Sequence, residues 1–384
     1  MLPVPRRPST LSFAEFRPQE LVAELIIRSR APLRVSFSGG GTDVPPYTEQ
    51  YGGVVLSSTI KKYAYCSLRA RVEDGLQVNS MGWTTGIGSD TIHSHLNGDT
   101  DLARAAVQRM GVTDRLEINT CSDCPPGSGL GSSSALVVAI LGGLSEWSAK
   151  TMERKRVAEM AHLIERSDVG IPGGMQDQYS AAMGGFNLIR FEKKGVTVEP
   201  LTISGAVRNE LEYRLLLCST GTTRPSGGIL GRQIKSYRER NPTVLEALHE
   251  IKKLTFDLNN ELVHGRVEEF GELLGHEWNL KKKLDPAISN EEVDKLYQTA
   301  LTNGAIGGKL LGAGGGGYLL LFAEDGSHKR LSSAMIKAGS KVENVRFEDV
   351  GLETWTVGYR DREQHDRAGQ RPQISEARAA TYAL

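Results

Sequence analysis

The order of apolar and polar residues predicts strands and helices that are mixed along most of the chain. Apolar and polar residues alternate over positions 25–38, and β-branched and aromatic residues are dense over 54–60 and 63–72, so these segments are expected to be strands. Further strands are predicted over residues 116–120, 186–191, 213–219, 318–323 and 354–357.

Between these strands, apolar residues recur at the spacing of one helix face. Helices are predicted over residues 101–110, 136–147 and 152–165, with a short helix after Gly173 and Gly174 and a largely helical stretch over 228–303. Because strands and helices are interleaved, the pattern indicates α+β layers rather than sequence repeats or a helical bundle.

Changes in composition suggest where domains begin and end. Residues 1–24 are rich in proline and charge and contain no apolar signal core, so a flexible leader is expected there rather than a secretion signal. The segment Pro200–Gly205 divides the remainder into expected domains of residues 25–205 and 206–359. Residues 360–384 are charged and interrupted by proline, which is typical of a tail. The expected location is the cytoplasm.

The overall composition limits the partners of the protein. Lys and Arg number 46 and Asp and Glu number 46, and this balance argues against a nucleic-acid partner. The longest apolar run, residues 135–144, is too short to span a bilayer, so no membrane partner is expected. The four cysteines do not form a disulfide scaffold. Cys121 and Cys124 form a C-x-x-C pair whose redox role stays open, whereas a metal site would need a second pair.

A loop rich in glycine and serine leads into the apolar run. After Pro125 it consists of Pro126, Gly127, Ser128, Gly129, Leu130, Gly131, Ser132, Ser133 and Ser134. In such a loop the backbone N–H groups converge at a helix N-terminus, where the positive end of the helix dipole also attracts phosphate. We therefore expect residues 126–134 to bind the phosphates of a nucleoside triphosphate. The alternative is an ordinary strand-to-helix turn with serine as N-cap.

Two further glycine-rich segments accompany this loop. One is Ser38-Gly39-Gly40-Gly41-Thr42-Asp43, and the other is Gly312-Ala313 followed by Gly314–Gly317. The three segments, in this order, resemble the GHMP family of small-molecule kinases. The central loop differs from the family's nucleotide motif, P-x-x-x-G-L-G-S-S-A, only by an extra serine, and the resemblance covers roughly residues 26–358.

The resemblance implies a two-domain GHMP kinase fold, classed as α+β. The N-terminal domain would be like ribosomal protein S5 domain 2 and the C-terminal domain ferredoxin-like, with the active site between them. ATP and Mg²⁺ would be the cofactors. The oligomeric state stays open, with a homodimer as one expectation.

Catalytic roles also follow from the resemblance. Residues 170–179 resemble the galactokinase segment G-I-M-D-Q, which makes Asp177 the catalytic base. Arg34 matches an arginine that stabilises developing charge and keeps the base ionised. Ser133 and Glu165 are the expected Mg²⁺ ligands, with Ser132 as the alternative serine, because Mg²⁺ prefers oxygen atoms. The alternative for Glu165 is an ordinary solvated glutamate on a helix. The alternative for Arg34 is an arginine at a strand edge that pairs with a surface acid.

The substrate prediction rests on where the chain departs from galactokinase. Asp43 matches an aspartate that binds sugar hydroxyls there, but galactokinases carry glutamate, histidine and threonine before it, where this chain has Gly40, Gly41 and Thr42. That difference argues against galactose. The segments look most like the branch acting on D-glycero-D-manno-heptose 7-phosphate, which implies transfer of phosphate to the anomeric hydroxyl and a 1,7-bisphosphate product.

Two groups of residues are expected to bind this sugar phosphate. The candidates for the sugar are Gly40, Gly41, Thr42, Asp43, Gly174, Gly314 and Gly315. Thr223 and Arg224 would form an anion site for the phosphate that the acceptor already carries, or simply a polar turn. A neutral acceptor such as L-fucose, or a non-catalytic sensor of sugar and ATP, is the alternative function.

Two other known motifs are excluded because the residues of this chain do not match them. Residues 304–310 are one residue short of a P-loop and lack the Ser or Thr after Lys309. The segment that begins with His276 and Glu277 starts like H-E-x-x-H but ends in Leu280, so it predicts no zinc site.

Overall fold

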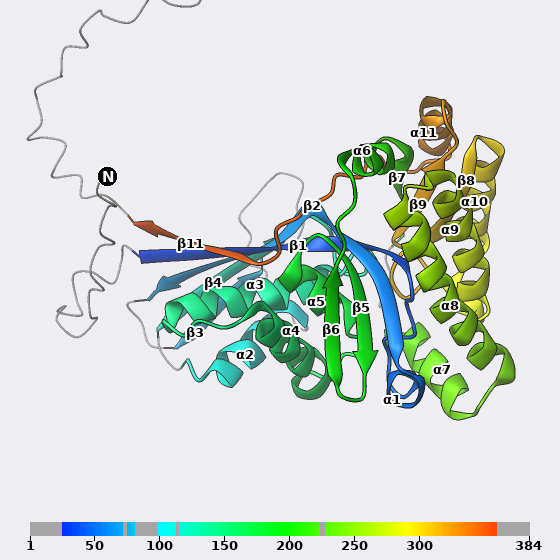
Figure 1. Ribbon diagram of the computed structural model, residues 1–384. Coiled ribbons are helices and arrows are strands. Elements are labelled where there is room, and N and C mark those ends of the chain that lie inside the picture. The colour runs from blue at the N-terminus through cyan, green and yellow to red at the C-terminus, as the bar shows by residue number, and fades with distance from the viewer. Residues whose placement is uncertain (1–24, 72–74, 81–97, 113–114, 223–226, 359–384) are drawn as a thin grey trace, which may run out of the picture.

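The computed structural model describes residues 25–71, 75–80, 98–112, 115–222 and 227–358, in which the strands form two sheets (Figure 1). The first sheet has the order β11-β1-β2-β4-β3, and β5 pairs with both β2 and β6. Its strands are β1 (Leu25–Ser38), β2 (Gly53–Ala70), β3 (Leu76–Ser80), β4 (Leu116–Ser122), β5 (Phe186–Glu192), β6 (Gly195–Pro200) and β11 (Glu353–Gly358).

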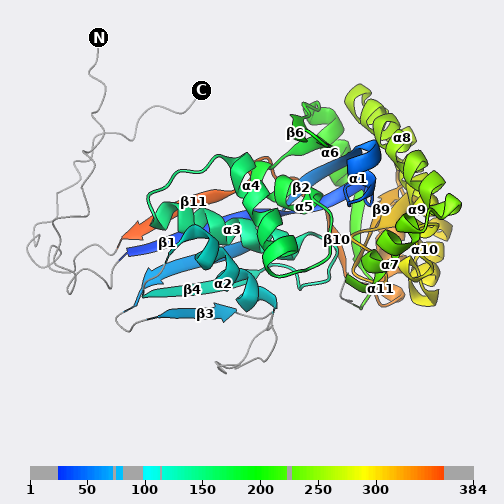
Figure 2. The same cartoon turned by 90° about the horizontal axis from the view of Figure 1, so that it is seen from below.

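The second sheet has the order β10-β7-β9-β8. Its strands are β7 (Leu215–Ser219), β8 (Ala305–Leu310), β9 (Tyr318–Ala323) and β10 (Val342–Asn344). Figures 1 and 2 both place this sheet and its helices at one end of the molecule, beside the first sheet.

Helices flank both sheets. The short helix α1 (Tyr47–Tyr51) connects β1 to β2. The helices beside the first sheet are α2 (Gly98–Met110), α3 (Ser132–Trp147), α4 (Arg154–Leu163) and α5 (Gln176–Met183) (Figure 2). Those associated with the second are α6 (Gly205–Arg214), α7 (Gly227–Arg238), α8 (Pro242–His264), α9 (Val267–Lys282), α10 (Glu291–Thr302) and α11 (His328–Lys337).

The two strands predicted over residues 54–60 and 63–72 are one long strand, β2. The β1–β2 register jumps from Tyr63 opposite Pro32 to Ile60 opposite Leu33, so the intervening lysines form a bulge and do not end the strand. One part of β2 then pairs with β4 and the other with β5. A single strand therefore connects the two halves of the first sheet.

The last strand in the described residues belongs to the first sheet, although its residues fall within the expected second domain. β11 pairs antiparallel with β1, from Arg30 opposite Glu353 to Leu25 opposite Gly358. This pairing covers an edge of β1 that would otherwise present unpaired backbone groups. The chain thus returns to its first sheet after building the second.

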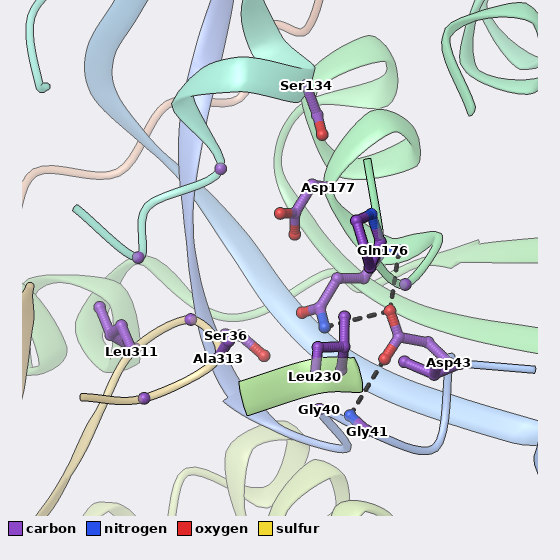
Figure 3. A pocket seen from close by; sticks show the side chains of 18 of the residues that line it. Ser36, Gly40, Gly41, Asp43, Ser134, Gln176, Asp177, Leu230, Leu311 and Ala313 are labelled. Carbon is purple, nitrogen blue, oxygen red and sulfur yellow. Dashed lines mark hydrogen bonds between the residues drawn. The ribbon is translucent and has the colours of Figure 1, made fainter. Parts of the chain in front are cut away.

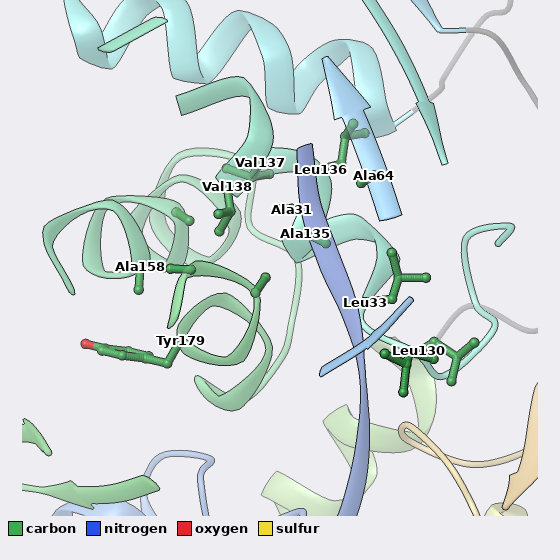
Figure 4. Close-up of a cluster of buried hydrophobic side chains, with 14 of the residues drawn as sticks. Ala31, Leu33, Ala64, Leu130, Ala135, Leu136, Val137, Val138, Ala158 and Tyr179 are labelled. Carbon is green, nitrogen blue, oxygen red and sulfur yellow. The ribbon is translucent and has the colours of Figure 1, made fainter. Parts of the chain in front are cut away.

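Helix α3 packs against β1 and β2 of the first sheet and lies in its core. Its residues from Ala135 to Leu144 are all buried, which explains the apolar run in the sequence. Figure 4 shows Ala135 and Val138 of this helix together with Leu33 from β1, Leu130 from the glycine-rich loop and Tyr179 from α5. None of the helices in the described part of the chain combines the length and the apolarity needed to cross a membrane.

The structure also contains elements that the residue pattern did not predict, namely α1, β3, β6, α6, β8, α11 and β10. Strand β8 is instructive because it occupies the segment that superficially resembles a P-loop. Added Cβ atoms at Gly307 and Gly308 would lie 2.0 Å from the Gly271 carbonyl oxygen and 2.5 Å from the Leu320 carbonyl oxygen. These glycines allow close packing of α9 and β9 against β8.

Candidate active site

A cavity of about 180 Å³ lies between the first sheet and the helices and turns of the second half. Residues from β1, the glycine-rich loop, α5, α7, α9 and the turn after β8 line it. The cavity therefore brings together all three glycine-rich segments that the sequence singles out (Figure 3).

The glycine-rich loop ends at the open N-terminus of α3. Gly127, Gly129 and Gly131 have φ values of +78°, +82° and +76°, a left-handed conformation that glycine adopts easily. Gly131 is the N-cap residue of α3. Because glycine has no side chain, no N-cap side chain accepts a hydrogen bond from the first N–H groups of the helix. Backbone N–H donors with a favourable helix dipole thus border the cavity, which suits a phosphate group.

The loop packs directly against the third glycine-rich segment. A Cβ added to Gly129 would lie 2.5 Å from the Leu311 carbonyl oxygen, and one added to Gly312 would lie 2.5 Å from the Gly129 Cα. Side chains at either position would push the two backbones apart. Glycine is therefore required here for contact between the two halves of the site.

Asp177 and Arg34 form an ion pair that faces the cavity. Asp177 lies in the first turn of α5, and its Oδ1 atom is 2.6 Å from Arg34 Nη2 and 2.8 Å from Arg34 Nε. Arg34 also donates to the Gly129 carbonyl oxygen at 2.6 Å, which fixes the guanidinium beside the glycine-rich loop. The Arg34 side chain is 4% exposed and that of Asp177 is 24% exposed, so the carboxylate is the more accessible partner.

Glu165 forms a second polar cluster with the serines of α3. It lies in a π-helical segment, Ile164–Asp168, that continues α4. Ser133 Oγ donates to its Oε1 at 3.2 Å and Ser134 Oγ to its Oε2 at 2.7 Å, while Gln178 also donates to Oε2. Glu165 is 2% exposed, so the alternative of a solvated glutamate is wrong. A hydroxyl and a carboxylate side by side are the hard oxygen ligands that suit Mg²⁺.

Asp43 is buried and hydrogen-bonded on both oxygens. Its Oδ2 accepts from the backbone N–H of Met175 at 3.0 Å and of Gln176 at 3.1 Å, and Oδ1 accepts from Gly41 at 3.1 Å. Burial raises the pKa of the Asp43 carboxyl, and these hydrogen bonds act in the opposite direction. A Cβ on Gly174 would lie 1.9 Å from Oδ2, so glycine is required for this approach.

Two buried lysines in the cavity wall were not among the predicted site residues. Lys281 of α9 donates to the carbonyl oxygens of Leu310 at 2.7 Å and Gly312 at 2.6 Å. Lys309 of β8 pairs with Glu277 at 2.7 Å. Burial lowers the pKa of the Lys281 ammonium to about 7 and also lowers the pKa of Lys309. The signal in the sequence is that Glu277 and Lys281 share the helix face of the apolar residues Leu274 and Trp278.

Not every predicted site residue lines the cavity. Of the predicted candidates, Gly40, Gly41, Gly174 and Gly314 line it with Asp43, as do Gly127, Gly129, Gly131 and Ser132–Ser134 of the loop. The side chain of Thr42 donates to Gly39 and accepts from Val54 N–H, so it holds its own loop. Gly315 N–H bonds to the Ile288 carbonyl oxygen at 2.8 Å outside the cavity lining. Pro126, Ser128 and Leu130 are also outside that lining. Thr223 and Arg224 lie outside the described residues.

The other sequence motifs carry no ligand cluster in the described part of the chain. There, Cys121 is exposed and Cys124 is buried, and both are free thiols. No group of three or more His, Cys, Asp and Glu residues within the described ranges has the geometry of a metal site.

Comparison with known proteins identifies the family of the chain. The N-terminal domain pattern of GHMP kinases matches residues 100–185, and the C-terminal pattern matches residues 258–341. A D-glycero-α-D-manno-heptose 7-phosphate kinase from Campylobacter jejuni is 35% identical over 340 residues, which cover 86% of this chain and 99% of that protein. This chain belongs to the GHMP kinase family. The predicted GHMP kinase fold is thereby confirmed.

Two further relatives are similar over most of this GHMP kinase. The crystal structure of a D-glycero-D-manno-heptose 1-phosphate kinase from Bacteroides thetaiotaomicron has a TM-score of 0.70 and 31% identity, and covers 86% of this chain and 98% of that one. A bifunctional fucokinase/GDP-fucose pyrophosphorylase from Arabidopsis thaliana is 28% identical over 366 residues, which are 89% of this chain but 33% of that protein.

Proposed function

We propose that this GHMP kinase transfers the γ-phosphoryl group of ATP to the anomeric hydroxyl of a heptose 7-phosphate. The observation that carries the proposal is one cavity in which the Asp177–Arg34 pair faces the uncapped N-terminus of α3. The similarity to a heptose 7-phosphate kinase across nearly its whole length supports the choice of acceptor. ATP is a cytoplasmic metabolite, and we place the reaction in the cytoplasm for that reason.

In this mechanism Asp177 accepts the proton of the acceptor hydroxyl. The hydroxyl oxygen then bonds to the γ-phosphorus of ATP while the bond from that phosphorus to the bridging oxygen breaks, and ADP leaves. Arg34 holds the Asp177 carboxylate in place through two contacts to Oδ1 and places positive charge beside the transferred group. The N–H groups at the start of α3 stabilise the phosphates.

Ser133 and Glu165 would hold Mg²⁺. They fit this ion because their oxygens are already 3.2 Å apart and Glu165 is buried next to the phosphate loop. Bound Mg²⁺ neutralises phosphate charge during transfer. Ser134 and Gln178 keep the Glu165 carboxylate oriented by donating to Oε2.

The test is ADP release with ATP and Mg²⁺ across a panel of acceptors that contains heptose 7-phosphate, heptose 1-phosphate, L-fucose and neutral hexoses. We expect turnover of heptose 7-phosphate, and a loss of kcat of at least about 100-fold in Asp177→Asn because the base is removed. Asp168→Asn is the matched control, since Asp168 is an exposed aspartate that pairs with Arg109.

Turnover of each acceptor in this panel leads to a different conclusion. Heptose 1-phosphate has a blocked anomeric hydroxyl, so its turnover in place of the 7-phosphate would move the transfer to another position. Turnover of L-fucose or a hexose alone would contradict the phosphorylated acceptor. ATP binding without turnover of any acceptor would favour a sensor.

A further inference from the structure

Three buried side-chain atoms of residues that line the cavity have no hydrogen-bond partner. One is Nε of Arg166, whose two other nitrogens donate to the carbonyl oxygens of Ile171 and Gly174. The other two are Oε1 of Gln176 at the start of α5 and Oγ of Ser36 on β1. Both residues line the cavity that also holds the Asp177 carboxylate (Figure 3). A buried polar group without a partner is costly, so such a pair in a cavity wall indicates a ligand that supplies the missing hydrogen bonds.

The orientation of the Gln176 amide is set by Asp43. Its Nε2 donates to Asp43 Oδ2 at 3.2 Å, and that oxygen already accepts two backbone N–H groups, so it acts as an acceptor toward the amide. The amide NH₂ must therefore face Asp43, and Oε1 faces away from it. Figure 3 shows this oxygen on the side of the amide away from Asp43.

Asp43 is itself poorly placed to bind a sugar. Its side chain accepts four hydrogen bonds from Gly41, Met175 and Gln176, and the residue is 1% exposed. Oδ2 already accepts three of these bonds, so a sugar hydroxyl would have to displace a protein donor there and could bind without displacement only at the buried Oδ1. This differs from the role that the resemblance to galactokinase implies for Asp43.

Building on the proposed function, we infer that Gln176 and Ser36 recognise hydroxyl groups of the acceptor sugar and that Asp43 is a positioning residue acting through Gln176. Gln176 Oε1 accepts a hydrogen bond from a hydroxyl other than the reacting one, because Asp177 next to it takes the reacting proton. Ser36 lies two residues after Arg34 and therefore on the same face of β1. Its Oγ atom forms a hydrogen bond with a second hydroxyl group of the sugar.

The first measurement compares steady-state kinetics of the wild-type protein, Gln176→Leu and Ser36→Ala. Loss of one hydrogen bond to a neutral hydroxyl is expected to raise KM for the acceptor about 10-fold, with KM for ATP unchanged and kcat nearly so. Gln77→Leu is the matched control, because Gln77 on β3 is an exposed glutamine whose amide bonds to Asn79.

The decisive measurement pairs each variant with a series of monodeoxy acceptors. If Gln176 binds one hydroxyl, the wild-type protein and Gln176→Leu have equal kcat/KM on the analogue that lacks it, and differ about 10-fold on the others. The same holds for Ser36→Ala on a different analogue. Equal ratios between variant and wild-type protein on every analogue would overturn the inference.

The role of Asp43 is tested by Asp43→Asn alone and combined with Gln176→Leu. A positioning role predicts that the double variant loses no more acceptor affinity than Gln176→Leu. Multiplied losses would mean that Asp43 binds the sugar directly. Should Asp43→Asn fail to fold, the deoxy series with Gln176→Leu and Ser36→Ala still decides the main inference.

Failure of the inference can be told from failure of the proposed function. If the wild-type protein turns over a neutral sugar instead of a heptose phosphate, the proposed function fails, and the deoxy series is run with that sugar. If it turns over heptose 7-phosphate but no analogue equalises the variants, the inference alone fails. If it neither binds nor converts any sugar, both fail.

Discussion

At the scale of single residues, the carboxylates of the site are held in fixed positions by hydrogen-bond donors. Glu165 shows this most clearly, because two serines and a glutamine donate to its carboxylate. Ser133 lies in the first turn of α3, and the π-helical segment carries Glu165 toward it. A buried carboxylate is costly unless it is paired or binds a cation, which supports the proposal that Glu165 holds Mg²⁺.

Glu165→Gln is therefore expected to weaken Mg²⁺ binding while the fold is kept. The amide cannot replace a charged ligand, so the Mg²⁺ concentration for half-maximal activity should rise at least about 10-fold. Activity against Mg²⁺ concentration at saturating ATP measures this. Glu159→Gln on α4 is the control, since Glu159 pairs with the exposed Arg156. Superimposable Mg²⁺ curves for both variants would contradict the metal role of Glu165.

At the scale of elements, the central feature is the backbone contact between the glycine-rich loop and the turn after β8. The loop precedes α3, and the turn connects β8 to β9, so two segments far apart in sequence share one contact surface. Gly129 combines a left-handed φ of +82° with an added Cβ only 2.5 Å from a carbonyl oxygen. Both constraints act on one residue.

Gly129→Ala is expected to separate these segments. The left-handed conformation alone costs an alanine about 1–2 kcal/mol, and the forced contact adds to it, for a total loss of about 3 kcal/mol or more. Urea denaturation measures the loss, and ATP binding should weaken with it. Gly111→Ala isolates the conformational part, because Gly111 has a φ of +67° with nothing within 4 Å of an added Cβ. Equal stability losses in the two variants would mean that the contact is not tight.

Local patterns predicted much of this arrangement, and contacts between distant residues account for the rest. The glycine-rich loop and α3 have signals within a few residues, and the segment with Asp177 was identified by its resemblance to a galactokinase motif. The pairing of β11 with β1 and the lysines of the cavity wall depend on partners far along the chain. No local pattern specifies which strand covers an edge or which carbonyl a lysine meets.

At the scale of the whole molecule, Lys281 connects α9 to the Asp177–Arg34 ion pair. It donates to the Gly312 carbonyl oxygen, and Gly312 packs on Gly129, whose own carbonyl oxygen accepts from Arg34. Arg34 in turn pairs with Asp177. One buried ammonium therefore supports a continuous series of contacts from α9 to the proposed base.

The pH dependence of stability should report on this lysine. Its pKa is about 7 in the folded protein and 10.5 as an ordinary lysine, so between these values the unfolded state binds the proton and the folded state does not. The free energy of unfolding of the wild-type protein should then rise with pH relative to Lys281→Met, by up to about 1.4 kcal/mol per pH unit. Urea denaturation of both proteins at pH 7 and pH 9 measures the difference. Parallel pH profiles would show that Lys281 titrates normally.

The return of β11 to the first sheet has a consequence for how the protein is made. During translation β1 and β2 emerge early from the ribosome. The strand β11, which pairs with β1 on the edge opposite β2, emerges only after all strands of the second sheet. At about 5–20 residues per second, that edge stays open for tens of seconds of translation. The first half of this kinase can therefore complete its sheet only when almost all of the second half has been synthesised, and nascent chains that stall before Glu353 carry an open edge for chaperones to shield.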